Sequence, residues 1–469
     1  MRNKRNEDSI HRLLPWRDLR MTSAQIIPIA FLCLILAGAF LLLLPVSSAP
    51  GEHTDFLTAL FTATTSVCVT GSVVVDTFSH WSLFGKVVIL ILIQVGGLGI
   101  IAVFSLLILL TKREFSVGGS ILLKDAYNLD SFKGINHFLT SVFLGTLLVE
   151  GIGAIGYMPA FTGRYGMVRG IWYSFFTSVS AFCNAGIDIM GPDSLTSYRA
   201  NPLVLIVTMA LIVLGGIGYI VWFDVMATGK KRLFRRGDIT YNFKRLHEHT
   251  RLVILLTILY IVWGALMVFL FECHNPGTIG DMPLFQKILN SFFESVTFRT
   301  AGFSTFPQEN LRETTAIFGI FLMFTGGSPV GTAGGVKTVT MFVLLANVLA
   351  FLREKDQVII LKRRIPSGMI RKATAIITVH FGIASVLCLC LMASSGLSFI
   401  DAMFEIMSAV STVGLSRAVT PDLNIWGRWI VILGMYLGRI GPISMLVFFN
   451  TRHPGRKGVR CADGRFIVG

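Results

Sequence analysis

Long apolar runs separated by short polar segments cover nearly the whole chain. A helix needs roughly 20 consecutive apolar residues to cross a bilayer. Runs of about that length or longer occur at eight places, at about residues 25–45, 86–110, 138–158, 202–226, 251–271, 314–350, 373–393 and 425–449. The sixth run is too long for one crossing, and glycine and proline interrupt it, so we expect it to break. The pattern predicts an all-α, polytopic membrane protein.

Four shorter amphipathic stretches lie between the members of successive pairs of spans, at about 55–66, 170–181, 284–297 and 399–410. They are too short to cross a bilayer, which predicts re-entrant helices that enter and leave on one side. Helix-start residues agree with this interpretation. We expect Asp55 as a cap, Pro283 at a first helical position, and Ser398 as a cap three residues before Asp401.

The short stretches are copies of one another. Each contains a segment that begins with phenylalanine and ends with glycine ten residues later, and the glycines are 115, 116 and 112 residues apart. The segments read FTATTSVCVTG (61–71), FTSVSAFCNAG (176–186), FFESVTFRTAG (292–302) and FEIMSAVSTVG (404–414). A second glycine cluster follows in each next span, as GGLG (96–99), GGIG (215–218), GGSPVG (326–331) and GRIG (438–441). The chain is therefore predicted to contain four M1–pore-loop–M2 repeats.

Charge sets the orientation of these repeats. Only 14% of the residues are charged, against about 25% in soluble domains. The net charge of +15 comes from lysine and arginine that gather in the two chain termini and in segments 111–137, 229–251 and 352–372. Basic loops stay in the cytoplasm, so we expect both termini to be cytoplasmic in a cell (inner) membrane. All four repeats then share one orientation, and parallel copies fit a pseudo-fourfold central pore. The basic excess is a topology signal, so no nucleic-acid partner is expected. The spans are expected to lie in the lipid bilayer.

The expected division of the chain follows these repeats. It is a cytoplasmic N-terminal tail (1–24), repeat 1 (25–110), repeat 2 with its preceding cytoplasmic loop (111–228), repeat 3 with a basic cytoplasmic loop and a gating loop at 326–337 (229–351), repeat 4 (352–450), and a cytoplasmic C-terminal tail (451–469).

The extended residues before each glycine are the predicted ion site. A re-entrant helix places the negative end of its dipole at the membrane centre, and the strand that follows can turn carbonyl oxygens toward a dehydrated cation. These strands carry no carboxylate, which favours a large monovalent cation, K⁺. One glycine per strand, where potassium channels have two, predicts a shorter and less strictly selective filter. The predicted filter residues are Cys68, Val69, Thr70, Gly71, Cys183, Asn184, Ala185, Gly186, Thr300, Ala301, Gly302, Ser411, Thr412, Val413 and Gly414.

Arg299 also lies in a filter strand, where an inward guanidinium would block conduction. We expect it to point away from the pore and to pair with Glu294 or another pore-helix carboxylate. Glu150 is a further charge inside a span, and such charges are functional hypotheses by default. Pairing with Lys337 or Arg439 and a packing role remain equally open for it.

The sixth run breaks at FTGGSPVGTAGGVKT (324–338), where five glycines and one proline cannot sustain a helix. A flexible segment at this depth, below the third filter strand, is placed to obstruct a pore. The predicted gate residues are Gly326, Gly327, Ser328, Pro329, Gly331, Thr332, Gly334, Gly335 and Lys337, together with Arg439 from the last span. The glycine-rich matches to nucleotide-binding motifs are rejected because apolar spans flank them, and no catalytic set is apparent, so an enzyme is not expected.

The fourfold plan, the single filter glycine per repeat, and the motifs TSVCVTG, SVTFRTAGF and GGSPVGTAGGVKT resemble the Ktr/Trk/HKT superfamily of potassium-translocating proteins. The short N-terminus is most similar to that of bacterial KtrB subunits. The resemblance implies that loop 326–337 is the gate and that Arg439 faces it. It also implies a homodimer with one pore per subunit, and a cytosolic KtrA-type regulatory ring that binds ATP, ADP or NAD(H). No cofactor is expected in this chain. K⁺ is the expected transported ion, and sodium transport is left open.

Two other classes fit the pattern less well. An alternating-access transporter predicts inverted repeats, whereas these repeats are parallel. A four-repeat voltage-gated channel predicts serial arginines in a span, and none is present. Coupled K⁺/Na⁺ or K⁺/H⁺ symport remains open.

Overall fold

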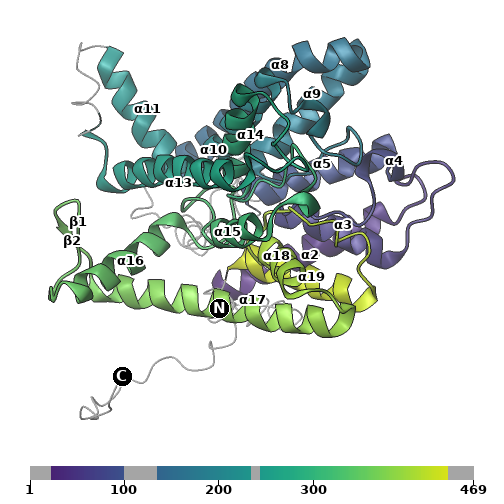
Figure 1. Cartoon of the computed structure of the whole chain (residues 1–469). Coiled ribbons are helices and arrows are strands. Elements are labelled where there is room, and N and C mark those ends of the chain that lie inside the picture. Colours follow the sequence, from purple (N-terminus) through teal and green to yellow (C-terminus); the bar gives the residue numbers. More distant parts are fainter. Residues whose placement is uncertain (1–22, 100–134, 234–242, 244, 442–469) are drawn as a thin grey trace, which may run out of the picture.

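The computed structural model describes residues 23–99, 135–233, 243 and 245–441. Both expected cytoplasmic tails, nearly all of the basic segment 111–137, much of the basic segment 229–251, and the ends of the second and eighth predicted spans lie outside the described residues. Within the described part, regular structure is almost entirely helical, as predicted (Figure 1).

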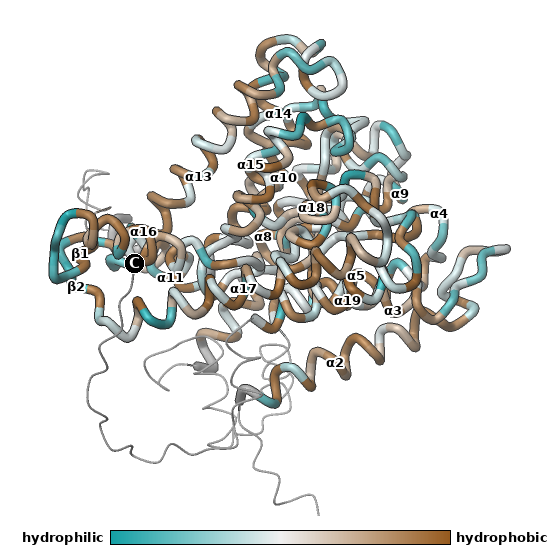
Figure 2. Tube along the Cα trace, turned by 60° about the horizontal axis from the view of Figure 1, so that its bottom comes forward, coloured by the Kyte–Doolittle hydropathy of each residue, from teal (hydrophilic) through white to brown (hydrophobic). Residues whose placement is uncertain are grey.

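In the described part of the chain, four single helices are long and apolar enough to cross a membrane. They are α2 (Ser23–Leu42), α8 (Ile135–Tyr165), α13 (Glu248–Glu272) and α17 (Ser367–Ser395). They match the predicted first span of each repeat. Figure 2 shows α2 and α13 mostly in the brown of apolar residues. Many of their large apolar side chains point outward, such as Leu259 on α13 and Leu389 on α17, both more than half exposed. Such a surface suits lipid rather than water.

The second helices of the four repeats are α5 (Leu83–Leu98), α10 (Pro202–Gly216), α15 (Glu313–Phe324) and α19 (Ile425–Ile440). In the second and third repeats, where the whole predicted run is described, this helix is shorter than predicted. The prediction of one straight span over 202–226 is wrong, because α11 (Tyr219–Leu233) turns by 99° from α10. Gly218 at the break has φ +96°, a left-handed angle that glycine adopts without strain. The predicted break in the sixth run is confirmed: α16 (Thr338–Leu352) follows α15 only after a loop over 325–337.

The four re-entrant helices are confirmed as α3 (Phe56–Cys68), α9 (Met167–Cys183), α14 (Leu284–Thr297) and α18 (Phe399–Val410). Asp55 caps α3 by accepting hydrogen bonds from the backbone N–H groups of Leu57 and Thr58. Ser398 caps α18 through the N–H of Asp401. Pro283 directly precedes α14 as its cap residue rather than starting the helix. Their inner ends are buried, which places them at the centre of the molecule.

Packing between repeats closes a ring. Each re-entrant helix contacts the second helix of the preceding repeat: α9 contacts α5, α14 contacts α10, α18 contacts α15, and α3 contacts α19. The last of these contacts joins the first repeat (purple) to the fourth (yellow), which lie next to each other in Figure 1. The fold is therefore the predicted set of four M1–pore-loop–M2 repeats around a pseudo-fourfold axis. The remaining short elements are α4 (Thr77–His80), two 3₁₀ turns (Thr196–Tyr198 and Gln308–Asn310) and the hairpin β1 (Ile359–Ile360) and β2 (Arg363–Arg364).

Candidate ion-conduction site

The four glycine-ended strands have the same backbone shape. All four glycines have positive φ, between +63° and +98°. The residue two positions before each glycine is also left-handed, although three residue types occur there: Val69 (φ 55°), Asn184 (60°), Thr300 (71°) and Thr412 (52°). The fourfold equivalence predicted from sequence spacing thus extends to individual backbone angles.

The strands meet around one axis at the glycines. A Cβ atom on Gly302 would lie 2.6 Å from the carbonyl oxygen of Val413 and 3.0 Å from the Cα of Gly186. The same relation runs around the ring, so each glycine faces the carbonyl oxygen that precedes a neighbouring glycine. The pairs are Gly71 with Ala185, Gly186 with Ala301, Gly302 with Val413, and Gly414 with Thr70. No side chain fits at any of the four glycines, and backbone carbonyl groups line the opening.

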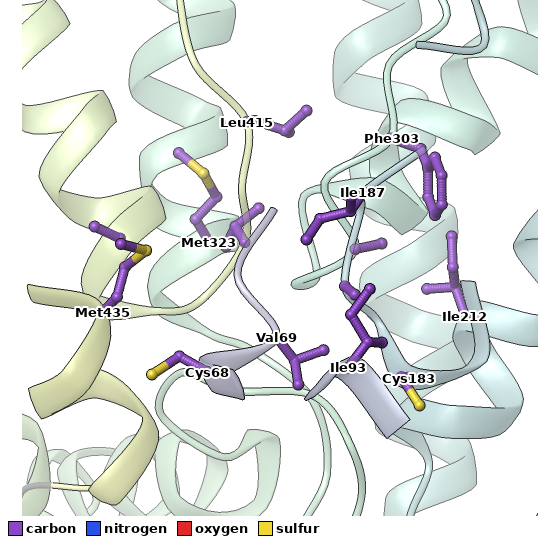
Figure 3. Packing of buried hydrophobic residues seen from close by; sticks show 14 of the residues in the cluster. Cys68, Val69, Ile93, Cys183, Ile187, Ile212, Phe303, Met323, Leu415 and Met435 are labelled. Carbon is purple, nitrogen blue, oxygen red and sulfur yellow. The ribbon is translucent and has the colours of Figure 1, made fainter. Parts of the chain in front are cut away.

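Hydroxyl groups of the re-entrant helices hold three of the strands from behind. The N–H of Gly71 donates to Thr65 Oγ1 (3.0 Å), that of Gly414 to Ser408 Oγ (3.0 Å), and that of Ile187 to Ser180 Oγ (3.1 Å). Thr65, Ser180 and Ser408 each lie six residues before a filter glycine. In the third repeat Thr297 instead donates to the carbonyl of Phe303 (2.6 Å). Figure 3 shows Ile187, Phe303 and Leu415, which follow three of the glycines, above Cys68, Val69 and Cys183. The hydroxyl six residues before the glycine was a readable signal in the sequence, and sequence reasoning missed it.

A cavity of about 410 Å³ lies directly outside the glycine ring, and all four filter glycines line it. Four acidic residues, Asp76, Asp188, Asp193 and Glu309, line this vestibule, and no lysine, arginine or histidine is among its lining residues. A cleft walled by one sign of charge raises the local concentration of the opposite ion. Although the chain as a whole is strongly basic, the vestibule is locally acidic and favours cations.

The intramembrane loop over 325–337 lies directly beneath the filter. It is held in shape by its own backbone, since the N–H of Gly326 donates to Val336 O (3.0 Å) and that of Thr338 to Gly327 O (3.0 Å). A Cβ on Gly334 would lie 2.6 Å from the carbonyl oxygen of Ser411 in the fourth filter strand. The loop therefore contacts the inner end of the filter.

Arg439 on α19 joins the loop to the surrounding helices. Its guanidinium donates to the carbonyl oxygens of Thr332 in the loop (2.6 Å) and Gly96 on α5. Thr332 Oγ1 donates in turn to Phe182 O at the end of α9 (3.2 Å). Lys337 donates to Ala333 O (2.7 Å), a contact within the loop. Among the predicted gate residues, Arg439 and Thr332 thus both tie the loop to other repeats.

Glycines in three of the second helices allow close contact with the re-entrant helices. A Cβ on Gly96, Gly215 or Gly438 would overlap a backbone carbonyl oxygen, that of Val67, Phe182 or Val410 respectively. Each of these carbonyls lies four residues before a filter glycine. The glycine cluster of the third repeat lies in the intramembrane loop instead.

Substituting Gly438 by alanine is expected to lower the thermal stability of the protein, because the added methyl group must displace backbone at Val410. Such overpacking costs about 1–3 kcal/mol. Gly382→Ala on α17 is the matched control, since nothing lies within 4 Å of its Cβ position, and alanine favours a helix by up to about 1 kcal/mol. The measurement is the midpoint of thermal unfolding in detergent for both variants. Equal midpoints would contradict the close packing.

The site geometry agrees with the comparisons with known proteins. The model of the TrkH family, described as a cation transport protein, matches residues 15–460. The chain belongs to the TrkH family of cation transport proteins. The family is one of membrane transporters and not of enzymes, as the sequence predicts.

Two relatives of this TrkH-family chain cover nearly its whole length. Ktr system potassium uptake protein B of Bacillus subtilis is 34% identical over 458 residues, which are 98% of this chain and 99% of that protein. Potassium/sodium uptake protein NtpJ of Enterococcus hirae is 34% identical over 433 residues, 91% and 92% of the two chains. The crystal structure of the potassium transporter TrkH from Vibrio parahaemolyticus has the same fold, with a TM-score of 0.73 at 16% identity over 93% of this chain and 86% of that one.

The structure shows the surroundings of two embedded charges of this TrkH-family protein, Arg299 and Glu150. Arg299 is buried and lines a small cavity with Gly216, Thr257 and Gly327, behind its filter strand, so it points away from the axis as predicted. The predicted pairing is wrong: within the described part of the chain, Arg299 forms no ion pair with Glu294 or any other carboxylate.

Glu150 lies between α5, α8 and α9 and accepts a hydrogen bond from Gln94 Nε2 (3.2 Å), with the thiol of Cys183 also donating to it (3.9 Å). Of the two roles left open for it, pairing with Lys337 or Arg439 is not observed, and the carboxylate anchors the packing behind the second filter strand.

Proposed function

We propose that this protein takes up potassium across the cell membrane through the glycine ring, in single file along the pseudo-fourfold axis. The observation that carries the proposal is the ring itself: the carbonyl groups of Thr70, Ala185, Ala301 and Val413 meet around one opening below an acidic vestibule. Carbonyl oxygens can replace the hydration shell of a monovalent cation. The printed names of both relatives above include potassium uptake, which supports the same ion.

Sodium is a second candidate ion. The name of the Enterococcus hirae relative includes sodium as well as potassium. Each filter strand carries one glycine, so the ring offers a short filter, and we propose that sodium enters it less readily than potassium. The experiment below compares how strongly the two ions compete for uptake.

We propose that the loop over 325–337 is the gate and that Arg439 holds it closed. The contact of Gly334 with the inner end of the filter and the two hydrogen bonds of Arg439 support this role. The Bacillus subtilis relative is named as part of a Ktr system. On that basis we propose a homodimer with cytoplasmic termini, regulated by a cytosolic KtrA-type ring that binds ATP, ADP or NAD(H).

Rubidium uptake into potassium-loaded proteoliposomes tests the proposed function. Protein-dependent uptake should be inhibited strongly by external potassium and weakly by external sodium, with protein-free liposomes as the control. The reconstitution is made with and without the regulatory ring, so that a closed gate is not mistaken for a wrong ion. Sodium competing as well as potassium, or no uptake in either preparation, would contradict the proposal.

We expect uptake at low potassium concentration to weaken as the external pH falls through about 6. Burial, with smaller contributions from the nearby Asp76 and Asp193, raises the pKa of Asp188 to about 6, against hydrogen bonds from the N–H of Met190 and from Ser194. Asp188 is therefore ionised above this pH and neutral below it. Losing one charge a few ångströms from the ion path lowers the local cation concentration by about two- to threefold.

The measurement is the initial rate of rubidium uptake against external pH for the wild type and for Asp188→Asn. The variant should show the low rate both above and below the pKa of Asp188, so its uptake should not change as the pH falls through that value. A step of equal size in the variant would assign the pH dependence to another group.

A further inference from the structure

Three polar residues form a stripe along one face of α18. Asp401, Glu405 and Ser408 are spaced four and three residues apart, which places them on the same side of a helix. Each binds a group in the segment over 414–420, which leaves the fourth filter strand. The stripe therefore faces the outward end of the fourth filter.

The three contacts differ in their surroundings. Ser408 Oγ accepts from the N–H of Gly414 (3.0 Å), Glu405 Oε1 accepts from Thr420 Oγ1 (2.6 Å), and the carboxylate of Asp401 forms an ion pair with Arg417 (3.1 Å). The side chain of Asp401 is 32% exposed, whereas Glu405 is 0% and Thr420 is 1% exposed. The hydrogen bond of Glu405 is thus shielded from water, where such bonds are strongest and where leaving a polar partner unpaired costs most.

Thr420 belongs to the wall of the vestibule. It lines this cavity together with Gly414, Leu415 and Ser416. Ser416 Oγ accepts from the N–H groups of Val419 and Thr420, both at 3.2 Å. This turn links Thr420 to Ser416, two residues beyond the filter glycine. A shift at Thr420 is therefore passed to the strand that ends in Gly414.

Among the four repeats, the fourth is unusual at this position. The residues nine places before the other filter glycines are Thr62, Thr177 and Phe293. A carboxyl group that is fully buried is costly unless its contacts offset the loss of hydration. The third repeat has Phe293 at this place but buries the carboxyl group of Glu294 one position later. The hydrogen bond to Thr420 is what distinguishes Glu405.

We propose that Glu405 is a positioning residue of the filter: its hydrogen bond to Thr420 holds the outer end of the fourth filter strand at the spacing that favours potassium over sodium. Glu405 touches no ion, and it acts through Thr420, Ser416 and the backbone at Gly414. The inference rests on the proposed function, because it concerns the ion preference of the same ring.

The first test compares Thr420→Val with Thr420→Ser. Valine keeps the shape of threonine and removes the hydroxyl donor, while serine keeps the donor. The readout is the ratio of the potassium and sodium concentrations that halve rubidium uptake into proteoliposomes, a ratio that does not depend on how much protein folds. Loss of one buried hydrogen bond changes an equilibrium by up to about tenfold. We expect the preference for potassium to fall by about three- to tenfold in Thr420→Val and to stay at the wild-type value in Thr420→Ser.

The second test changes the acceptor. Glu405→Gln keeps an oxygen that accepts from Thr420 and should lose less preference than Glu405→Leu, which removes it. Combining Glu405→Leu with Thr420→Val should lower the preference no further than either change alone, because both remove one bond. Ser398→Ala is the control, since Ser398 is exposed and caps the outer end of α18, and its hydrogen bonds go to Asp401 rather than to the segment over 414–420.

The outcomes separate the two proposals. A wild type with no preference for potassium overturns the proposed function. A wild type with the preference, together with a Thr420→Val variant of unchanged ratio, overturns the role of Glu405 and leaves the proposed function intact. A Ser398→Ala variant that loses as much preference as Thr420→Val also overturns it, because any weakening of α18 would then suffice.

Discussion

Replacing Gly302 by serine is expected to remove most of the preference for potassium over sodium. Gly302 has φ +81°, an angle that costs a residue with a Cβ about 1–2 kcal/mol. Its Cβ would also lie 2.6 Å from Val413 O and 3.0 Å from the Cα of Gly186. Both neighbours are backbone of other repeats, so the ring must open to admit the side chain. We expect at least about a tenfold loss of preference, which corresponds to the 1–3 kcal/mol of local strain.

The control for this prediction is Gly166→Ser. Gly166 has nearly the same angle, φ +79°, but nothing lies within 4 Å of its Cβ position. This variant carries the backbone strain without the collision. Both proteins are compared by the inhibition of rubidium uptake by potassium and by sodium. If the two variants lose the same preference, general strain rather than the ring explains the effect, and the glycines are not the filter.

Replacing Arg439 by alanine is expected to raise uptake in the absence of any regulator by about tenfold or more. The substitution removes the hydrogen bonds to Thr332 O and Gly96 O, and bonds from a charged donor contribute about 1.5–3 kcal/mol each. It also removes a positive charge that repels potassium beneath the filter. The loop over 325–337 then loses its tie to α5 and α19, and the closed arrangement loses stability.

The ion preference of Arg439→Ala should remain that of the wild type, because the glycine ring is untouched. Arg439→Lys is the informative companion, since lysine keeps the charge but lacks the planar fork that reaches two carbonyl groups. An intermediate flux in Arg439→Lys would separate the contribution of charge from that of geometry. Unaltered flux in Arg439→Ala, both with and without the regulatory ring, would remove Arg439 from the gate.

The re-entrant helices and the filter strands could be predicted closely because they leave local signals. A cap such as Asp55 and a terminal glycine such as Gly71 mark the two ends of a short helix within a few residues. The bend at Gly218 could not be predicted, since the residues on both sides of it are apolar and hydropathy continues through the turn. The surroundings that make the turn acceptable come from the loop, where Tyr219 N–H donates to Val330 O (3.0 Å).

The pattern of apolar and polar residues could not predict contacts between segments that are distant in the sequence. The acidic vestibule is built by residues of three repeats that meet only when the ring closes, among them Asp76, Asp188 and Glu309. No spacing in the sequence therefore predicts it. The pairing predicted for Arg299 failed for a related reason. Glu294 is close to it in the sequence, but the guanidinium lies against the preceding repeat, beside Gly216 of α10.

The glycine ring is built from main-chain atoms, and this leaves the neighbouring side chains free to diverge. Val69, Asn184, Thr300 and Thr412 share one backbone conformation, although their side chains are of three different types. A chain that arose by duplication of one unit could thus keep its opening nearly fourfold while each repeat acquired different side chains behind the opening, such as the carboxylate of Glu405 or the guanidinium of Arg299. For this reason the glycine ring can be nearly symmetric although the side chains behind it differ between repeats. Exchanging one repeat for that of a relative should keep the ring and change the side chains that support it.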